Sequence, residues 1–129
     1  MNYLTESEIQ AINQVVIEET GGSIGTREPG LLISIAQKPG ATFSGEDLYP
    51  DVFLKAAVLY EAVVNYHVFI DGNKRAGFAA MVRFLAINSY NIRVTDKEIE
   101  KFTIAIALKK QDLADIAEWI KRHAKRIAK

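Results

Sequence analysis

The chain has 129 residues, a hydrophobic fraction of 49% and no formal net charge at pH 7, which suits a single globular domain with a buried core. A neutral chain lacks the basic excess of proteins that coat nucleic acid or an anionic membrane, so we expect no specific nucleic-acid partner and no membrane partner. Cysteine is absent, which excludes disulfides and thiolate metal sites. The N-terminus does not resemble a signal peptide, and no apolar run reaches the ~18 residues of a membrane span, so we expect a cytoplasmic protein.

The first predicted helix begins at a capping box, in which Thr5 and Glu8 have the Thr-x-x-Glu spacing. The apolar positions that follow share one helical face: Ile9, Ile12, Val15 and Val16. Gly21 and Gly22 should end this helix. The sequence GGSIG, which they begin, could be a nucleotide-binding loop, but that motif requires a preceding strand. A loop that caps the helix is therefore favoured over a phosphate-binding loop.

A short second helix is predicted to start in the segment Arg27–Leu32, with Pro29 in its first turn, where the missing N–H costs nothing. Its buried face would consist of Leu31, Leu32 and Ile35. From residue 38 to residue 50, proline and glycine break any helix, and residues 41–43 are the only short extended segment. By composition alone, an ordinary surface connection explains residues 38–50 equally well.

Two apolar helices are predicted next, over Asp51–Tyr66 and from Lys74 to about Ser89. The first is apolar around most of its circumference, which is typical of a helix at the centre of a domain. The second has apolar side chains at helical spacing between Phe78 and Ile87. We therefore expect two central helices that are joined by the short segment between them.

The C-terminal third is predicted to contain two more helices. Residues 88–93 should form a turn, and Thr95 and Glu98 repeat the capping-box spacing before a helix with four apolar positions: Ile99, Phe102, Ile104 and Ile106. A last helix begins at Gln111–Asp112. The basic residues among 121–129 should complement the negative end of its dipole and stay solvated. A nucleic-acid patch is disfavoured there because no interleaved aromatic side chain could stack on bases.

The segment HVFIDGNKR, residues 67–75, joins the two central helices and has the residue types of a reactive site. His67 can take up a proton near neutral pH, although a lone histidine beside an apolar helix is more often structural. Asp71 offers the oxygen ligands that Mg²⁺ prefers. Gly72 would let the backbone approach a ligand closely, because it has no Cβ.

The last residues of this segment open the second central helix. Free N–H groups, the positive end of the helix dipole and the two cations of Lys74 and Arg75 would therefore meet at one place, next to Asn73. The sequence predicts a phosphate-binding site there.

These residues resemble the signature of the Fic/Doc superfamily, His-x-Phe-x-x-Gly/Ala-Asn-Gly/Lys-Arg. The chain is similar to the death-on-curing (Doc) branch, because Lys74 occupies a slot that most Fic proteins fill with a second glycine. Phe78 stands where Fic adenylyltransferases usually have a further arginine. The segment Arg27–Leu32 is also similar to an upstream stretch of chromosomal Doc proteins. The resemblance implies one all-α Fic/Doc-like domain, residues 1–129, with about six helices, two of them central.

The resemblance further implies that residues 38–50 form the flap, a loop or hairpin that lies over the active site and aligns the target segment. The protein would be a Doc-like toxin of a toxin–antitoxin system, a kinase that uses ATP and Mg²⁺ to phosphorylate a threonine of elongation factor Tu and so blocks translation. His67 would accept the proton of the target hydroxyl, and Asp71 would hold the Mg²⁺ that bridges the nucleotide phosphates. Phe69 would anchor the loop in the interior. The phosphates would be bound by the backbone N–H groups of Gly72 and Asn73, together with Lys74 and Arg75.

Three other functions are compatible with the motif. The nearest is a Fic-type adenylyltransferase, although Lys74 and Phe78 would disturb the nucleotide pose that adenylylation needs. A metal-dependent phosphohydrolase would require more histidine and aspartate ligands than the two that the motif offers, His67 and Asp71. A non-catalytic nucleotide-binding or interaction module ranks last, because every position of the motif is filled.

Regulation by a separate protein is also expected from the resemblance. Many Fic proteins inhibit themselves with a segment of the form Ser/Thr-x-x-x-Glu-Gly/Asn, which this sequence lacks. The resemblance instead implies an antitoxin partner, whose disordered C-terminal segment would fold as it binds.

Overall fold

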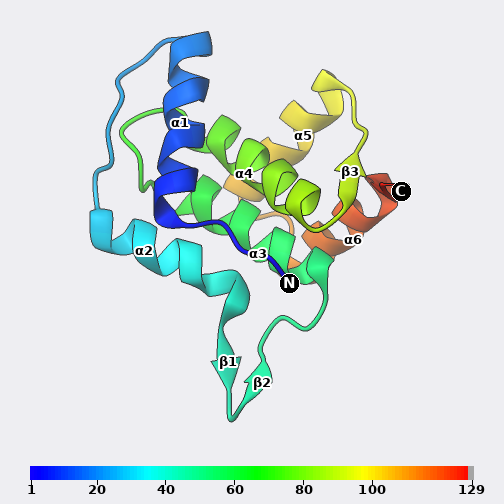
Figure 1. Ribbon diagram of the computed structural model, residues 1–129. Helices are drawn as coiled ribbons and strands as arrows, with labels where there is room; N and C mark the ends of the chain where they lie inside the picture. Colours follow the sequence, from blue (N-terminus) through cyan, green and yellow to red (C-terminus); the bar gives the residue numbers. More distant parts are fainter. Residues whose placement is uncertain (128–129) are drawn as a thin grey trace.

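The computed structural model describes residues 1–127, which form six α-helices, one short 3₁₀-helix and two small two-stranded sheets (Figure 1). The all-α expectation is confirmed, since the strands are only two or three residues long. The elements are α1 Glu6–Thr20, α2 Pro29–Gln37, η1 Lys38–Gly40, β1 Thr42–Phe43, β2 Glu46–Asp47, α3 Val52–Asn65, α4 Asn73–Ile87, β3 Tyr90–Ile92, α5 Asp96–Ala107, α6 Leu113–His123 and β4 Ala124–Arg126.

Side-chain caps start most of the helices. At α1, the Thr5 hydroxyl accepts from the Glu8 N–H at 3.2 Å, and the Glu8 carboxylate accepts from the Thr5 N–H at 3.0 Å. The same reciprocal pair forms at Thr95 and Glu98, so both predicted capping boxes are present. Such a cap contributes roughly 1 kcal/mol to helix stability. By contrast, the residue that precedes α4 is Gly72, which has no side chain to cap the helix. No capping side chain among residues 1–127 therefore occupies the N–H groups at the start of α4, and they can bind another acceptor.

The two central helices, α3 and α4, pack closely along each other. A Cβ added at Gly77 of α4 would lie 2.6 Å from the Val64 side chain and 3.2 Å from the Tyr60 carbonyl oxygen, both on α3. Only glycine permits this approach. The other helices surround the pair and bury apolar side chains against it, including Ile35 of α2 and Ile120 of α6. Residues 66–72, which join α3 to α4, are consequently fixed at both ends by the core.

The apolar face predicted for α1 is partly wrong. Val15 is 52% exposed, whereas the buried residues of α1 are Ile9, Asn13 and Ile17. These three are spaced by four residues and therefore lie on one side of the helix, while Val15 is turned away from it. An amide thus occupies the middle of the buried face of α1.

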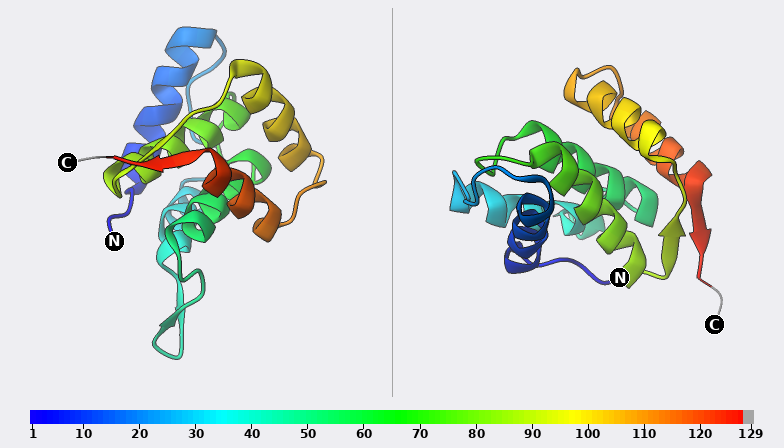
Figure 2. Two further views of the ribbon diagram at one scale, coloured as in Figure 1. Left: turned by 90° about the vertical axis from the view of Figure 1, so that its right-hand side faces the viewer. Right: turned by 90° about the horizontal axis from the view of Figure 1, so that it is seen from above.

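The predicted turn over residues 88–93 is only partly right: residues 88 and 89 form a turn, but the following residues form β3. This strand pairs antiparallel with β4, and Tyr90 lies opposite Arg126 (Figure 2). The basic residues near the C-terminus are therefore divided between a helix and a strand. The first of them occupy the last turn of α6, and the next ones form β4. Residues 128–129 lie outside the described part of the chain.

The predicted flap contains a hairpin that projects from the helices (Figure 1). Its turn consists of Ser44 and Gly45, which both have positive φ, as tight two-residue hairpin turns require. The second strand, β2, was not predicted, because Glu46 and Asp47 have low strand propensity. Lys55 of α3 anchors the hairpin: its Nζ donates to the Pro39 carbonyl at 2.9 Å and to the Asp47 carboxylate at 3.1 Å.

Within residues 1–127, none of the helices has the length and apolar character that crossing a bilayer would require.

Candidate active site

The segment between α3 and α4 borders an open pocket of about 630 Å³. The pocket lies where the C-terminal ends of α1 and α3 meet the start of α4, and Figure 1 shows this connection passing beside α1. All six predicted site residues line it: His67, Asp71, Gly72, Asn73, Lys74 and Arg75. The remaining lining residues are Thr20, Gly21, Gly22, Val64 and Ile70.

His67 follows the end of α3 and is exposed to solvent. Its backbone is left-handed, with φ of 51°, a conformation that is uncommon outside glycine and that concentrates at functional sites. Among residues 1–127, the hydrogen bonds made by imidazole groups all belong to the other histidine, His123. The His67 ring is thus held on a constrained backbone with its nitrogens available to a substrate.

Phe69 holds the segment in the domain, as predicted for an internal anchor. Its side chain is fully buried in the core. Its backbone is bound by the side chain of Asn73, whose Oδ1 accepts from the Phe69 N–H and whose Nδ2 donates to the Phe69 carbonyl, both at 3.0 Å. The expected contribution of Asn73 was its backbone N–H group. The structure shows a second role, because the Asn73 side chain links the start of α4 to the preceding loop.

The start of α4 concentrates positive charge on the pocket. Its first helical hydrogen bond runs from the Ala76 N–H to the Gly72 carbonyl at 2.8 Å, so the N–H groups of residues 73–75 precede it and have no acceptor within the helix. Lys74 and Arg75 are exposed and form no ion pair with residues 1–127. The positive end of the helix dipole and the two cationic side chains therefore lie together, an arrangement that favours binding of an anion.

Gly72 is needed for a different reason from the one expected. Its φ of 78° is left-handed, and an added Cβ would lie 2.9 Å from Cδ1 of Ile17. The missing side chain therefore lets the segment pack against α1, rather than making room for a ligand. Glycine is required here by the fold of the loop.

Asp71 is held by two segments that lie far from it in the sequence. Its Oδ2 accepts from the backbone N–H of Ser23 at 2.8 Å, and its carbonyl oxygen accepts from Nδ2 of Asn13 at 2.9 Å. Asn13 is the buried amide of α1, only 2% exposed. A polar residue on an otherwise apolar helix face was the available signal for this contact, since buried polar groups need partners.

The Asp71 carboxylate fits a Mg²⁺ ion that a nucleotide also binds. Residues 1–127 contain no group of three or more His, Asp or Glu side chains able to hold a metal by themselves. Mg²⁺ in nucleotide sites is commonly held by one or two carboxylates together with phosphate oxygens and water. The backbone N–H of Ser23 donates to Oδ2, so the other carboxylate oxygen, Oδ1, remains available to a cation.

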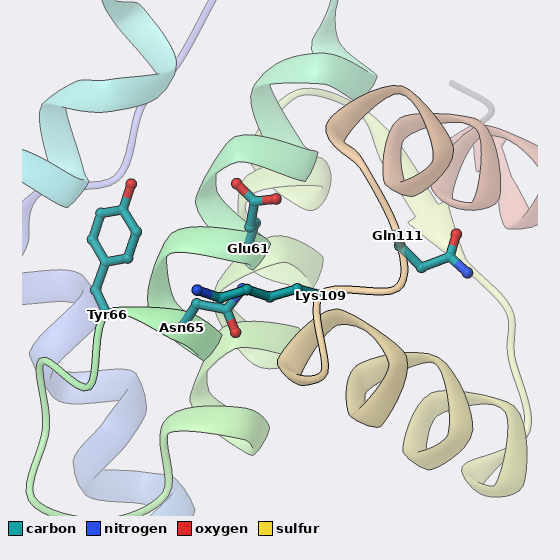
Figure 3. A pocket seen from close by; sticks show the side chains of 5 residues that line it. All are labelled: Glu61, Asn65, Tyr66, Lys109 and Gln111. Carbon is teal, nitrogen blue, oxygen red and sulfur yellow. The ribbon is translucent and has the colours of Figure 1, made fainter.

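A second hollow, of about 330 Å³, lies between α3 and the connection of α5 to α6 (Figure 3). Its lining residues are Glu61, Asn65, Tyr66, Lys109 and Gln111. The Lys109 side chain extends across it toward Asn65, and the lining has both charge signs. This hollow contains none of the predicted site residues and lacks the concentrated positive charge at the start of α4.

The segment that contains the pocket matches the sequence profile of one protein family. The sequence profile of the Fic/DOC family matches residues 3–85, which extend from before α1 into the last turn of α4. A curated relative, "Toxin Doc" of Mycolicibacterium smegmatis (strain ATCC 700084 / mc(2)155), is 40% identical over 72 residues, which are 56% of this chain and 55% of that protein. The match thus covers about half the length of the relative. Since the family profile covers more than half of the chain, including the motif and both central helices, the chain belongs to the Fic/DOC family.

Proposed function

We propose that this protein is a Doc-type toxin, a kinase that transfers the γ-phosphate of ATP to a threonine hydroxyl of elongation factor Tu and so blocks translation. One observation carries the proposal: a solvent-accessible imidazole and the uncapped, doubly cationic start of a helix border the same pocket. The first can accept a proton and the second can bind phosphate. Similarity to the relative named Toxin Doc supports assignment to the Doc branch of the family.

The proposed phosphate-binding groups are the backbone N–H groups at the start of α4 and the side chains of Lys74 and Arg75. Positioning and electrostatic stabilisation account for most of the catalysis in phosphoryl transfer. Both depend on groups whose positions are already fixed before the substrate binds. The bonds from Asn73 to Phe69 and the packing of α4 on α3 fix this helix start.

His67 is the proposed general base. An imidazole nitrogen takes the proton of the threonine hydroxyl as its oxygen attacks the γ-phosphorus. The bond between that phosphorus and the bridging oxygen of the β-phosphate breaks, and ADP leaves with the electron pair. Asp71 would hold the Mg²⁺ ion, which neutralises charge on the phosphates when it is bound. His67 later returns its proton to solvent.

Phe78 favours the kinase over an adenylyltransferase. Its ring is half buried and packs edge-on against Tyr60 of α3, with the ring centroids 5.9 Å apart and an interplanar angle of 70°. An aromatic side chain that packs toward the core supplies no cation for the outer phosphates of a nucleotide. Together with Lys74, it supports a reversed nucleotide that presents its γ-phosphate to His67.

An antitoxin is the proposed partner. The chain has no self-inhibitory Ser/Thr-x-x-x-Glu-Gly/Asn segment, so a separate protein would restrain the toxin. Its disordered C-terminal segment would fold on this domain. Co-expression with the product of the neighbouring gene should abolish toxicity, and unchanged toxicity would contradict this partner.

Intact-mass spectrometry of elongation factor Tu tests the transfer directly. Incubation with this protein, ATP and Mg²⁺ should add about 80 Da, one phosphoryl group. His67→Ala should abolish the gain, while His123→Ala serves as the matched control, because the only other histidine lies at the end of α6 and does not line the pocket.

Each alternative result has a definite meaning. A gain of about 329 Da, one adenylate, would replace the kinase with a Fic-type adenylyltransferase. Full phosphorylation by His67→Ala would overturn the general base. No gain with the unaltered protein would overturn elongation factor Tu as the target.

A further inference from the structure

The connection between α1 and α2, residues 21–28, pairs with the motif segment through its backbone. The Arg27 N–H donates to the Val68 carbonyl at 2.7 Å, and the Ile70 N–H donates to the Gly25 carbonyl at 3.0 Å. These bonds flank an antiparallel bridge between residues 26 and 69. The connection and the motif segment are therefore one hydrogen-bonded unit, although they are far apart in the sequence.

Within this unit, the Asp71 side chain is bound by the connection rather than by its own neighbours. The Ser23 N–H donates to Oδ2 at 2.8 Å, which leaves Oδ1 with no donor among residues 1–127. A hydrogen bond from a fixed backbone N–H to a charged oxygen restricts rotation of the carboxylate. This restriction suits a carboxylate that must present one particular oxygen.

Gly22 brings the connection close enough for this bond. Its φ is +111°, and a Cβ added there would lie 3.2 Å from both Cβ and Oδ2 of Asp71. Gly21 beside it also has a positive φ, +85°, but an added Cβ would meet nothing within 4 Å. The two glycines therefore need the same kind of backbone conformation, and only Gly22 lies against the carboxylate.

We propose that Gly22 and the Ser23 backbone are positioning elements of the cation site, which turn the Asp71 carboxylate so that Oδ1 faces the Mg²⁺ of a bound Mg²⁺–nucleotide. The inference rests on the proposed function, because it takes Asp71 as the residue that holds the cation. It gives the glycine-rich connection a role that its sequence alone does not indicate. The connection would act through the Asp71 carboxylate, to which its backbone donates a hydrogen bond.

The test measures how much Mg²⁺ strengthens nucleotide binding. Isothermal titration with the β,γ-imido analogue of ATP, with Mg²⁺ and then with EDTA, gives two dissociation constants whose ratio is the magnesium gain. Gly22→Ala should reduce this gain by ~10-fold or more, the usual effect of removing a group that orients a metal ligand. Gly21→Ala should leave it unchanged, since it adds the same backbone strain without touching Asp71.

Two further variants complete the comparison. Asp71→Asn should lose the gain, because it removes the charge that holds the cation. Ser23→Ala should keep it, because the backbone N–H and not the hydroxyl donates to Asp71. If Gly22→Ala matches Gly21→Ala while Asp71→Asn loses the gain, the positioning role is overturned and the proposed function stands. If Asp71→Asn keeps the gain, the cation role of Asp71 itself fails.

A measurement on the unaltered protein covers the case in which Gly22→Ala does not fold. The amide signal of Ser23 in a ¹⁵N–¹H NMR spectrum should shift when Mg²⁺ is added to the protein–analogue complex, and this shift should vanish in Asp71→Ala. The Gly21 amide, which donates to the Ile17 carbonyl at 2.8 Å, is the internal reference. A Ser23 signal that does not respond to Mg²⁺ would overturn the proposal.

Discussion

The carboxamide of Asn73 forms two hydrogen bonds with the backbone of Phe69, one with its N–H and one with its carbonyl, each 3.0 Å long. Asn73 is the first residue of α4, and Phe69 is the buried anchor of the preceding loop. One side chain therefore couples the loop that carries His67 to the helix that carries both cations. The position of His67 relative to Lys74 and Arg75 therefore depends on the bonds between Asn73 and Phe69.

Replacing Asn73 by alanine should lower both stability and nucleotide affinity. Two partly buried backbone groups would lose their partner, which costs roughly 1–3 kcal/mol in the free energy of unfolding. Thermal unfolding and nucleotide titration measure the two effects. Asn88→Ala is the matched control, because Asn88 bonds the backbone at the other end of α4. That variant should lose stability and keep its nucleotide affinity; equal loss of affinity in both would contradict the coupling.

Arg75→Ala should chiefly weaken nucleotide binding and leave the fold intact. Arg75 is exposed at the pocket and forms no ion pair with residues 1–127, so its removal breaks no structural contact of that kind. A charge-assisted bond to phosphate contributes about 1.5–3 kcal/mol, or ~10- to 150-fold in the dissociation constant. Arg83→Ala, on the exposed side of the same helix, should have no effect. An affinity unaltered in Arg75→Ala would remove this side chain from the phosphate site.

Lys55 should be required to hold the hairpin of the flap on the domain. Its side chain is 1% exposed and bonds both Pro39 and Asp47, while Asp47 itself remains 46% exposed. Lys55→Met should cost about 1–3 kcal/mol in unfolding free energy, with the lost hydrogen bonds as the cause. It should also increase amide exchange at β1 and β2. Lys101→Met, on the exposed surface of α5, is the control. Unchanged exchange in the hairpin would contradict the anchoring.

The same lysine should make stability fall at high pH. Burial by itself lowers the pKa of Lys55, but its interactions with Tyr3 and Asp47 outweigh this effect and raise the pKa above 10.5. A pKa that folding raises adds stability below the unfolded value, and that stability is lost as the pH rises through the folded pKa. Urea unfolding above pH 10.5 should therefore show a steeper loss in the unaltered protein than in Lys55→Met.

Glu98 should contribute to stability in the opposite pH range. Hydrogen bonds from the Thr95 backbone and hydroxyl, and a smaller effect of His123, lower the pKa of Glu98 below 4.5. A carboxylate with a lowered pKa adds stability above its unfolded pKa, and this is lost as the pH falls through the folded pKa. Glu98→Gln should flatten the loss of stability below pH 4.5, and Glu100→Gln should not. Equal acid profiles for the two variants would contradict this assignment.

Some features follow from residues that are close in the sequence. The capping box of Thr5 and Glu8 depends only on three-residue spacing, so the start of α1 could be predicted. The apolar residues that cover most of the circumference of residues 52–64 likewise placed α3 at the centre. The six predicted site residues reach one pocket because they are nearly consecutive and lie between two core helices. Their chemical roles remain proposals.

Other features depend on contacts between distant segments. Asn13 and Ser23 bond Asp71 across 58 and 48 residues, and β3 pairs with β4, which follows it only after the intervening helices α5 and α6. No local pattern specifies such partners, because a backbone N–H or a carboxamide can bond any acceptor that the packing brings near. The sequence by itself thus determined the helices and the chemical groups of the site. Only the tertiary structure decided which distant backbone group holds the Asp71 carboxylate, because that bond requires α1 and the connection after it to be packed against the motif.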